Sequence, residues 1–189
     1  MNSKLIVLSA PSGAGKTTIA KKLLEENPKW RFSVSCTTRP RRSQEKNFED
    51  YEFITSAEFL YRKEKGLLLE FEEVHGQMYG TLQSIVDDAL NKRRVLVLDM
   101  DVNGAMMIKK TYPKESITIF IHPPNFDVLN ERLKNRGTDS KEKIKERLKR
   151  TSLEVEKSVE FDIEVVNVNI HETVEKISNE IQRINERDK

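Results

Sequence analysis

Residues 5–18 of the chain read LIVLSAPSGAGKTT, a short apolar run followed directly by a glycine-rich turn. The four apolar residues that open this stretch are typical of a strand buried within a parallel sheet. A helix is expected after the turn, because Ile19, Leu23 and Leu24 recur at helical spacing until Pro28 ends the pattern. The stretch therefore predicts a strand–loop–helix unit at the start of the chain.

The turn within this unit has the features of a phosphate-binding loop, or P-loop. Gly13 and Gly15 let backbone N–H groups point inward around phosphate oxygens, where a side chain would collide. Lys16 is placed to reach the β- and γ-phosphates of a nucleotide, and Thr17 to bind Mg²⁺ through its hydroxyl. Ala10 stands where the full pattern begins with glycine, so the consensus is incomplete. The residues predicted to bind ATP here are Ser12, Gly13, Ala14, Gly15, Lys16, Thr17 and Thr18.

Three further apolar runs predict strands at Val95–Leu98, Ile117–Ile121 and Ile163–Val166. Helical patterns separate these runs, and the last helix is expected from about residue 172 to residue 186. Alternation of strands and helices predicts an α/β fold, with a parallel sheet covered by helices on both faces. In such folds ligands bind at the carboxyl ends of the strands.

Two aspartates follow the second apolar run. Asp99 stands at the predicted end of the strand, a position from which a carboxylate reaches the Mg²⁺ of a bound nucleotide. Asp101 would project to the same side if the strand continued. The alternative interpretation is an acidic strand end that leads into a solvated turn. The P-loop favours the functional interpretation, with Thr17 and Asp99 as metal ligands, partly through water.

Two segments interrupt the alternation. Residues 34–83 contain polar and aromatic groups in mixed short patterns, and residues 126–157 are strongly basic with helical signals. We interpret both as excursions from one core, because a chain of 189 residues fits a single compact domain.

Composition excludes several classes of protein. The chain has 33 Lys and Arg residues against 31 Asp and Glu, so its net charge of +2 gives no general reason to expect nucleic acid or a membrane surface as partner. One cysteine, Cys36, excludes an internal disulfide and is expected to be buried and inert. Three scattered histidines make a histidine metal site unexpected. No signal peptide or membrane span is recognisable, so a cytoplasmic location is expected, and no protein partner is implied.

Residues 33–42, SVSCTTRPRR, resemble the signature of guanylate kinases. Further blocks of that family follow in order along almost the whole chain. They are Glu45, Asp50-Tyr51, Glu70, Tyr79-Gly80-Thr81, Leu98-Asp99-Met100-Asp101, Arg132-Leu133 and Arg136-Gly137-Thr138.

The resemblance implies a P-loop nucleoside monophosphate kinase fold with a five-stranded parallel sheet. It implies transfer of the γ-phosphate of ATP to GMP, and to dGMP, with Mg²⁺, in purine nucleotide metabolism. Residues 1–33, 84–125 and 158–189 would form the core, residues 34–83 the GMP-binding region, and residues 126–157 a lid.

The resemblance also implies a role for individual residues. Those expected to hold the GMP phosphate are Ser35, Arg39, Arg42, Tyr51 and Tyr79, and those expected to hold the guanine are Glu70, Thr81 and Asp101. Gly80 is also expected to belong to the GMP-binding site. The catalytic cations would be Lys16, Arg132, Arg136 and Arg147, and Asn167 would lie near adenine.

The chemistry of these residue types agrees with such roles. Arginine presents a rigid fork of donors to phosphate oxygens. Guanine offers a ring N–H and an amine to one carboxylate, whereas adenine presents a lone pair at the ring position. Glu70 is therefore expected to select the base. The second ionisation of a phosphate monoester lies near pH ~6, so GMP arrives largely as a dianion that can attack directly. No general base is therefore needed.

Some positions depart from the family. Gln44 and Phe48 replace glycines around Glu45, and Pro40 precedes Arg41 instead of following it, which leaves Arg41 or Arg42 as the second phosphate arginine. Two other functions stay open. A related P-loop kinase for a ribose phosphate would not need a base selector, and a non-catalytic guanylate-kinase-like interaction module would typically lose the P-loop lysine.

Overall fold

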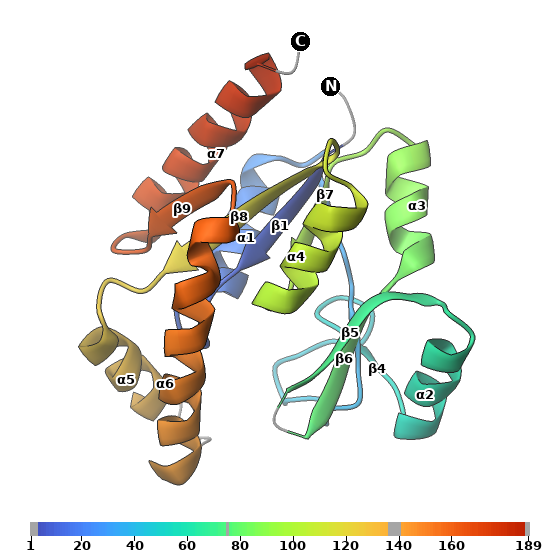
Figure 1. Ribbon diagram of the computed structural model, residues 1–189, viewed down its shortest axis with the longest axis horizontal. Coiled ribbons are helices and arrows are strands. Elements are labelled where there is room, and N and C mark those ends of the chain that lie inside the picture. Colours follow the sequence, from blue (N-terminus) through green and yellow to red (C-terminus); the bar gives the residue numbers. More distant parts are fainter. Residues whose placement is uncertain (1–3, 75, 136–140, 188–189) are drawn as a thin grey trace.

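The computed structural model describes residues 4–74, 76–135 and 141–187. Its centre is a five-stranded sheet in the order β2-β7-β1-β8-β9, in which all neighbouring strands are parallel (Figure 1). The first strand therefore lies in the middle, with β7 on one side and β8 on the other. The strands are β1 (Leu5–Ser9), β2 (Arg31–Phe32), β7 (Leu96–Asp99), β8 (Ser116–His122) and β9 (Ile163–Val166).

The side chains of β1 alternate between the two faces of this sheet. Leu5 and Val7 pack on one face and Ile6 and Leu8 on the other, and all four are fully buried. A strand covered on both faces explains the continuous apolar run in the sequence. The covering helices are α1 (Lys16–Glu26) and α7 (Ile170–Arg187) on the face of Ile6, and α3 (Gln83–Asn91) and α4 (Val102–Thr111) on the face of Leu5.

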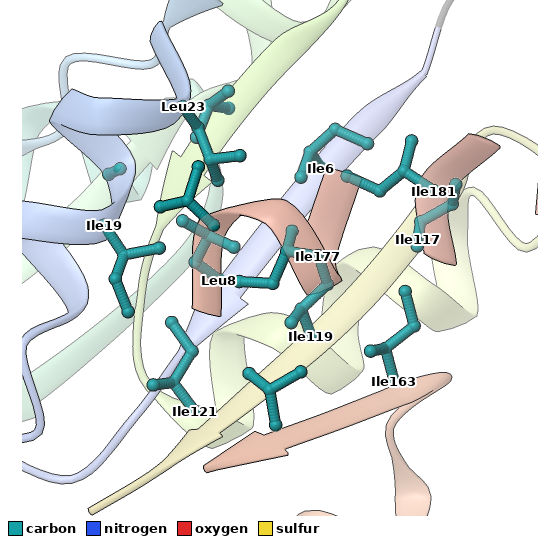
Figure 2. Close-up of a cluster of buried hydrophobic side chains, with 14 of the residues drawn as sticks. Ile6, Leu8, Ile19, Leu23, Ile117, Ile119, Ile121, Ile163, Ile177 and Ile181 are labelled. Carbon is teal, nitrogen blue, oxygen red and sulfur yellow. The ribbon is translucent and has the colours of Figure 1, made fainter. Parts of the chain in front are cut away.

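Figure 2 shows the packing on the face that α1 and α7 cover. Ile19 and Leu23 reach the sheet from α1, and Ile177 reaches it from α7. Burying one such side chain stabilises the fold by roughly 1.5–3 kcal/mol. This packing fixes the carboxyl end of β1, from which the P-loop departs.

A second sheet has the strand order β4-β3-β6-β5. β5 and β6 form an antiparallel hairpin, and β3 pairs with β6 antiparallel and with β4 parallel. Figure 1 shows this sheet below α3 and α4, with β5 close to α4. Its elements are β3 (Cys36–Thr37), β4 (Glu52–Phe53), α2 (Ser56–Glu64), β5 (Leu68–Val74) and β6 (Gln77–Leu82).

The basic segment of the sequence is helical. α5 (Phe126–Asn135) and α6 (Lys141–Glu156) lie side by side, with Leu129 buried against Leu148 (Figure 1). A short 3-10 helix, η1 (Lys157–Glu160), connects α6 to β9.

The expected α/β fold with a five-stranded parallel sheet is confirmed. Differences concern bounds and short elements. Val95 lies outside β7, which continues to Asp99, and α7 begins at Ile170 rather than at residue 172. β2 has only two residues, too few for a periodic pattern to be recognised.

Cys36 is fully buried, as expected. Burial raises the pKa of its thiol to about 11, and Sγ donates to the carbonyl of Gly80 at 3.3 Å. In the described part of the chain, none of the helices combines the length and the apolar character that crossing a bilayer requires.

Candidate active site

The P-loop between β1 and α1 turns at two glycines in the left-handed region, Gly13 with φ 96° and Gly15 with φ 97°. A Cβ on Gly15 would lie only 2.5 Å from Nδ2 of Asn167. The Asn167 amide, which is buried just after β9, donates to the carbonyl of Ala14 at 2.7 Å. Both the backbone angle and the space therefore require glycine at position 15, and Asn167 supports the loop from beneath.

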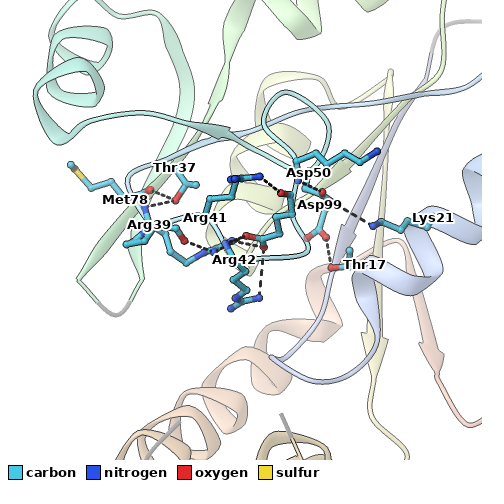
Figure 3. Close-up of polar contacts among 12 residues, drawn as sticks. Thr17, Lys21, Thr37, Arg39, Arg41, Arg42, Asp50, Met78 and Asp99 are labelled. Carbon is cyan, nitrogen blue, oxygen red and sulfur yellow. Dashed lines mark hydrogen bonds and ion pairs between the residues drawn. The ribbon is translucent and has the colours of Figure 1, made fainter. Parts of the chain in front are cut away.

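Lys16 and Thr17, the first residues of α1, meet Asp99 at the end of β7. Lys16 Nζ lies 2.7 Å from Asp99 Oδ1 and also donates to the carbonyl of Met100 at 2.7 Å. The hydroxyl of Thr17 donates to Asp99 Oδ2 at 3.2 Å (Figure 3). A cation, a hydroxyl and a carboxylate thus converge beside the P-loop, as the strand-end position of Asp99 predicted.

Glu45 organises the loop that carries the arginines. Arg39 donates to both its oxygens, at 2.7 and 2.9 Å, and the backbone N–H of Arg42 donates at 2.8 Å (Figure 3). Burial alone would raise the pKa of Glu45, but the hydrogen bonds and charges of Arg39 and Arg42 together outweigh it and hold the pKa below its usual value. The guanidinium of Arg39 also lies 5.5 Å from the ring centre of Tyr51 and 5.6 Å from that of Phe53. The Arg39 guanidinium therefore makes cation–π contacts with both aromatic rings.

Arg41 and Arg42 differ in position. Arg41 Nη1 donates to the backbone carbonyl of Glu45 at 2.8 Å, whereas Arg42 lines the cavity described below. A second link joins this loop to the core, since Lys21 Nζ of α1 lies 3.2 Å from Asp50 Oδ1 (Figure 3).

A different group of polar side chains gathers where β5 and β6 approach α4. Glu70 pairs in register with Thr81, and the Thr81 hydroxyl lies 3.3 Å from that of Ser35. Burial raises the pKa of Glu70, opposed by a hydrogen bond with Thr81 and reinforced by the charge of Asp101. Asp101 caps α4, because Oδ1 accepts from the N–H of Gly104 at 2.9 Å. Two carboxylates therefore lie close together in a half-buried position.

One cavity of about 290 Å³ connects the P-loop with both groups. The predicted site residues that line it are Ser12, Gly13, Gly15, Lys16, Thr17, Thr18, Ser35, Arg42, Tyr51, Glu70, Tyr79, Gly80, Asp99 and Asp101. Among the predicted residues whose side chains the structure describes, four lie outside the lining. Ala14 and Asn167 contact each other beneath the loop, Arg39 stacks on Tyr51, and Thr81 contacts Ser35.

Comparison with known proteins agrees with this geometry. A family model described as "Guanylate kinase" matches residues 2–184. A guanylate kinase of Thermotoga maritima is 44% identical over 177 residues, which are 94% of this chain and 85% of that protein. A guanylate kinase of Salinibacter ruber is 43% identical over 180 residues, 95% of each chain. The chain belongs to the guanylate kinase family.

A solved structure gives the same result. The crystal structure of guanylate kinase from Anaplasma phagocytophilum matches with a TM-score of 0.78 at 32% identity, over 96% of this chain and 86% of that one. The guanylate kinase family therefore accounts for the fold as well as for the sequence.

Three predicted arginines of the guanylate kinase lid remain at the level of prediction. Arg132 belongs to α5 and Arg147 to α6, and Arg136 lies outside the described residues. The adenine contact expected of Asn167 also stays a prediction; its amide hydrogen bonds the P-loop backbone.

Phe48, which the resemblance identifies as a departure from a family glycine, has an unusual backbone angle. Its φ is 62°, in the region that favours glycine, and its N–H donates to the carbonyl of Tyr51 at 2.9 Å. A side chain in this conformation costs roughly 1–2 kcal/mol. The turn keeps a glycine-like shape although the glycine is absent.

Sequence reasoning missed a charge cluster around Arg150 of α6. Its Nη2 donates to Glu72 at 2.9 Å and to Asp101 at 3.0 Å, and its Nε donates to Glu154 at 3.0 Å. Burial and the neighbouring Asp101 raise the pKa of Glu72 to about 7. The spacing of Arg150 and Glu154 on one helix was the only signal in the sequence, since fold alone brings Glu72 to them.

Replacing Arg150 by methionine should destabilise the fold in a pH-dependent way. The change leaves three carboxylates without their shared cation, and we expect a loss of about 1–3 kcal/mol at pH 8. Because the pKa of Glu72 is raised, from 4.5 to about 7, the folded state binds more protons than the unfolded state between those values, and stability falls as pH rises through them. At pH 5.5 Glu72 is neutral and the loss should be smaller.

Urea unfolding of both proteins at pH 5.5 and pH 8 measures this effect. Arg183→Met is the control, because Arg183 pairs with Glu180 on the exposed surface of α7. It should change the unfolding free energy by less than about 0.5 kcal/mol. If Arg150→Met lost the same unfolding free energy at both pH values, the pairing of Arg150 with the ionised Glu72 would be contradicted.

Proposed function

We propose that the protein transfers the γ-phosphate of ATP to GMP, giving ADP and GDP. The observation that carries this proposal is the single cavity that joins the P-loop to Arg42 and Tyr51 on one side and to Glu70 on the other. A phosphate-binding loop alone indicates a nucleotide, whereas the second half of the cavity suits a purine monophosphate. dGMP is proposed as a further acceptor, and the cytoplasm as the location.

In this function the phosphate of GMP would lie between the P-loop and the loop that carries Arg39 and Arg42. We assign its oxygens to Ser35, Arg39, Arg42, Tyr51 and Tyr79, and the base to Glu70, Thr81 and Asp101, with Gly80 as a further residue of the GMP site. Arg42 is preferred to Arg41 because Arg42 lines the cavity while Arg41 bonds to the backbone of Glu45. Residues 34–83 then act as the GMP-binding region.

On the donor side, Lys16 would exchange its contacts with Asp99 and Met100 for the phosphates of ATP. The lid of residues 126–157 would add positive charge through Arg132, Arg136 and Arg147, and closure would exclude water from the γ-phosphate. The GMP phosphate, largely a dianion above pH ~6, attacks without a general base. These residues therefore align the two phosphates and neutralise the group in transfer.

Thr17 and Asp99 form a donor set that fits Mg²⁺. Their hydroxyl and carboxylate oxygens are hard ligands of the kind this ion prefers, and they lie within 3.2 Å of each other beside the P-loop. When bound there, Mg²⁺ would supply charge neutralisation to the phosphates of ATP.

A coupled assay of ADP release tests the proposal. The purified protein is given MgATP and, in turn, GMP, dGMP, AMP, UMP and a ribose bisphosphate. We expect GMP to be used best, dGMP next, and AMP with a kcat/KM at least about a hundredfold below that of GMP, because mismatched donors and acceptors are left unpaired in the site. Preference for the ribose bisphosphate would assign the chain to a related kinase. Binding of GMP without turnover would make it an interaction module.

A further inference from the structure

Gly104 is the third residue of α4, in the turn that Asp101 caps. Its backbone is ordinary helix, since the described glycines with positive φ are Gly13, Gly15, Gly66 and Gly76. Glycine is a poor helix former, and alanine is the best. Neither backbone angle nor helix propensity therefore explains a glycine at this position.

The space beside Gly104 is occupied by the Glu70 carboxylate. A Cβ on Gly104 would lie 2.9 Å from Glu70 Oε2 and 3.3 Å from its Cδ, and 3.3 Å from Asp101 Oδ1. A carbon and an oxygen do not approach to 2.9 Å without repulsion, so one of them has to move. Glu70 Oε2 is the end of a rotatable side chain, whereas the Cβ is fixed to a helix packed on the core sheet. The carboxylate would move.

Gly104 acts on the second carboxylate through its backbone. Its N–H donates to Asp101 Oδ1 at 2.9 Å, while Asp101 Oδ2 accepts from Arg150 at 3.0 Å. Both oxygens of Asp101 thus have a fixed partner, and the orientation of the carboxylate is set by α4 and α6 together.

We propose that Gly104 is a positioning residue for recognition of the guanine base, because its missing side chain admits the Glu70 carboxylate and its N–H orients Asp101. The inference rests on the proposed function and deepens it: base selectivity depends on a helix residue that does not itself contact the base. A methyl group at this position would misplace Glu70 without unfolding the protein.

Gly104→Ala tests this, since alanine keeps the N–H and adds only the methyl group. We expect kcat/KM for GMP to fall about tenfold or more, mainly through KM, because the carboxylate binds the base in ground and transition states alike. kcat/KM for AMP and KM for MgATP should stay within about twofold. The melting temperature should not fall, because alanine favours the helix. A clear drop in melting temperature would overturn the proposal, because the proposal requires the Glu70 carboxylate to move while α4 keeps its position and stability.

A double variant shows whether the methyl group at position 104 acts through its contact with the Glu70 carboxylate or through another partner. Glu70→Asp shortens the side chain by one methylene and withdraws the carboxylate from position 104, at a cost in GMP activity of its own. In that background Gly104→Ala should cost no more than about twofold, since the two changes are coupled through one contact. An equal loss in both backgrounds would overturn the proposal, because the methyl group would then act on another partner.

Two further proteins complete the design. Met107→Ala changes the exposed face of the same helix and should leave GMP activity unaltered. Glu70→Gln reports on the base selector itself. If Glu70→Gln loses selectivity while Gly104→Ala stays within about twofold of wild type, Gly104 is excluded and the proposed function stands. A wild-type protein that does not phosphorylate GMP would overturn the proposed function instead.

Discussion

Lys16→Met is expected to reduce phosphoryl transfer about a thousandfold, because a lost donor to the transferred phosphate costs up to about 4 kcal/mol of transition-state stabilisation. In the structure Lys16 Nζ lies 2.7 Å from Asp99 Oδ1 and from the Met100 carbonyl, so the cation already stands at the P-loop. Methionine preserves the length of the side chain and removes its charge. The fold should persist, because Asp99 retains its hydrogen bond from Thr17.

The measurement is kcat at saturating ATP and GMP, accompanied by calorimetric binding of GMP alone. GMP affinity should change less than about threefold, since the lost charge acts on the donor phosphates. Lys22→Met, on the same helix and paired with Glu25 at its surface, is the matched control and should retain full activity. Retention of more than about a tenth of wild-type turnover by Lys16→Met would refute the P-loop assignment.

Glu70→Gln should cost GMP specificity on the order of 2–4 kcal/mol, because a charged hydrogen-bond acceptor is removed from a half-buried site. The ionised carboxylate accepts from both donors of guanine, whereas an amide turns only its oxygen toward them and sets its own N–H₂ against the second. AMP use should change little or rise slightly, since the repulsion of the adenine lone pair is relieved. The ratio of kcat/KM for GMP to kcat/KM for AMP should therefore fall.

The same variant tests how KM for GMP depends on pH. Burial raises the pKa of Glu70 above its usual value, so the carboxyl gains a proton earlier as pH falls, and KM for GMP should rise on the acid side. Glu70→Gln should lack this acid limb. Glu73→Gln is the control, because Glu73 is exposed on the opposite face of β5. An unchanged GMP-to-AMP ratio in Glu70→Gln would move base selection to Thr81 and Asp101.

The parts of the fold that the sequence predicts are those with local determinants. β1, the P-loop and α1 follow one another without interruption, and an apolar run, two glycines and a helical repeat suffice to recognise them. Asp99 was predictable for the same reason, since the end of a buried strand is visible in the sequence. The family resemblance extended this to Arg42, Tyr51 and Glu70, which the structure brings to the same cavity.

The remaining features depend on distant partners. β3 and β4 have two residues each, so no periodicity reveals the second sheet. Arg150 meets Glu72 across 78 positions and Asp101 across 49, and Gly104 is explained only by a side chain on another strand. Such contacts are set by tertiary packing, which a pattern within a single segment does not encode.

The amide that supports the P-loop has a consequence for the order in which the protein matures. The Asn167–Ala14 hydrogen bond spans 153 positions, and β1 gains its two neighbours only when Leu96 and Ser116 are available. Synthesis proceeds from the N-terminus toward the C-terminus, so the residues of the P-loop are made before the partner that supports them. A nascent chain that ends before β9 carries every residue of the P-loop motif and lacks the support that shapes it. Synthesis and folding of β9, rather than synthesis of the motif, therefore mark the point at which the P-loop gains this hydrogen bond.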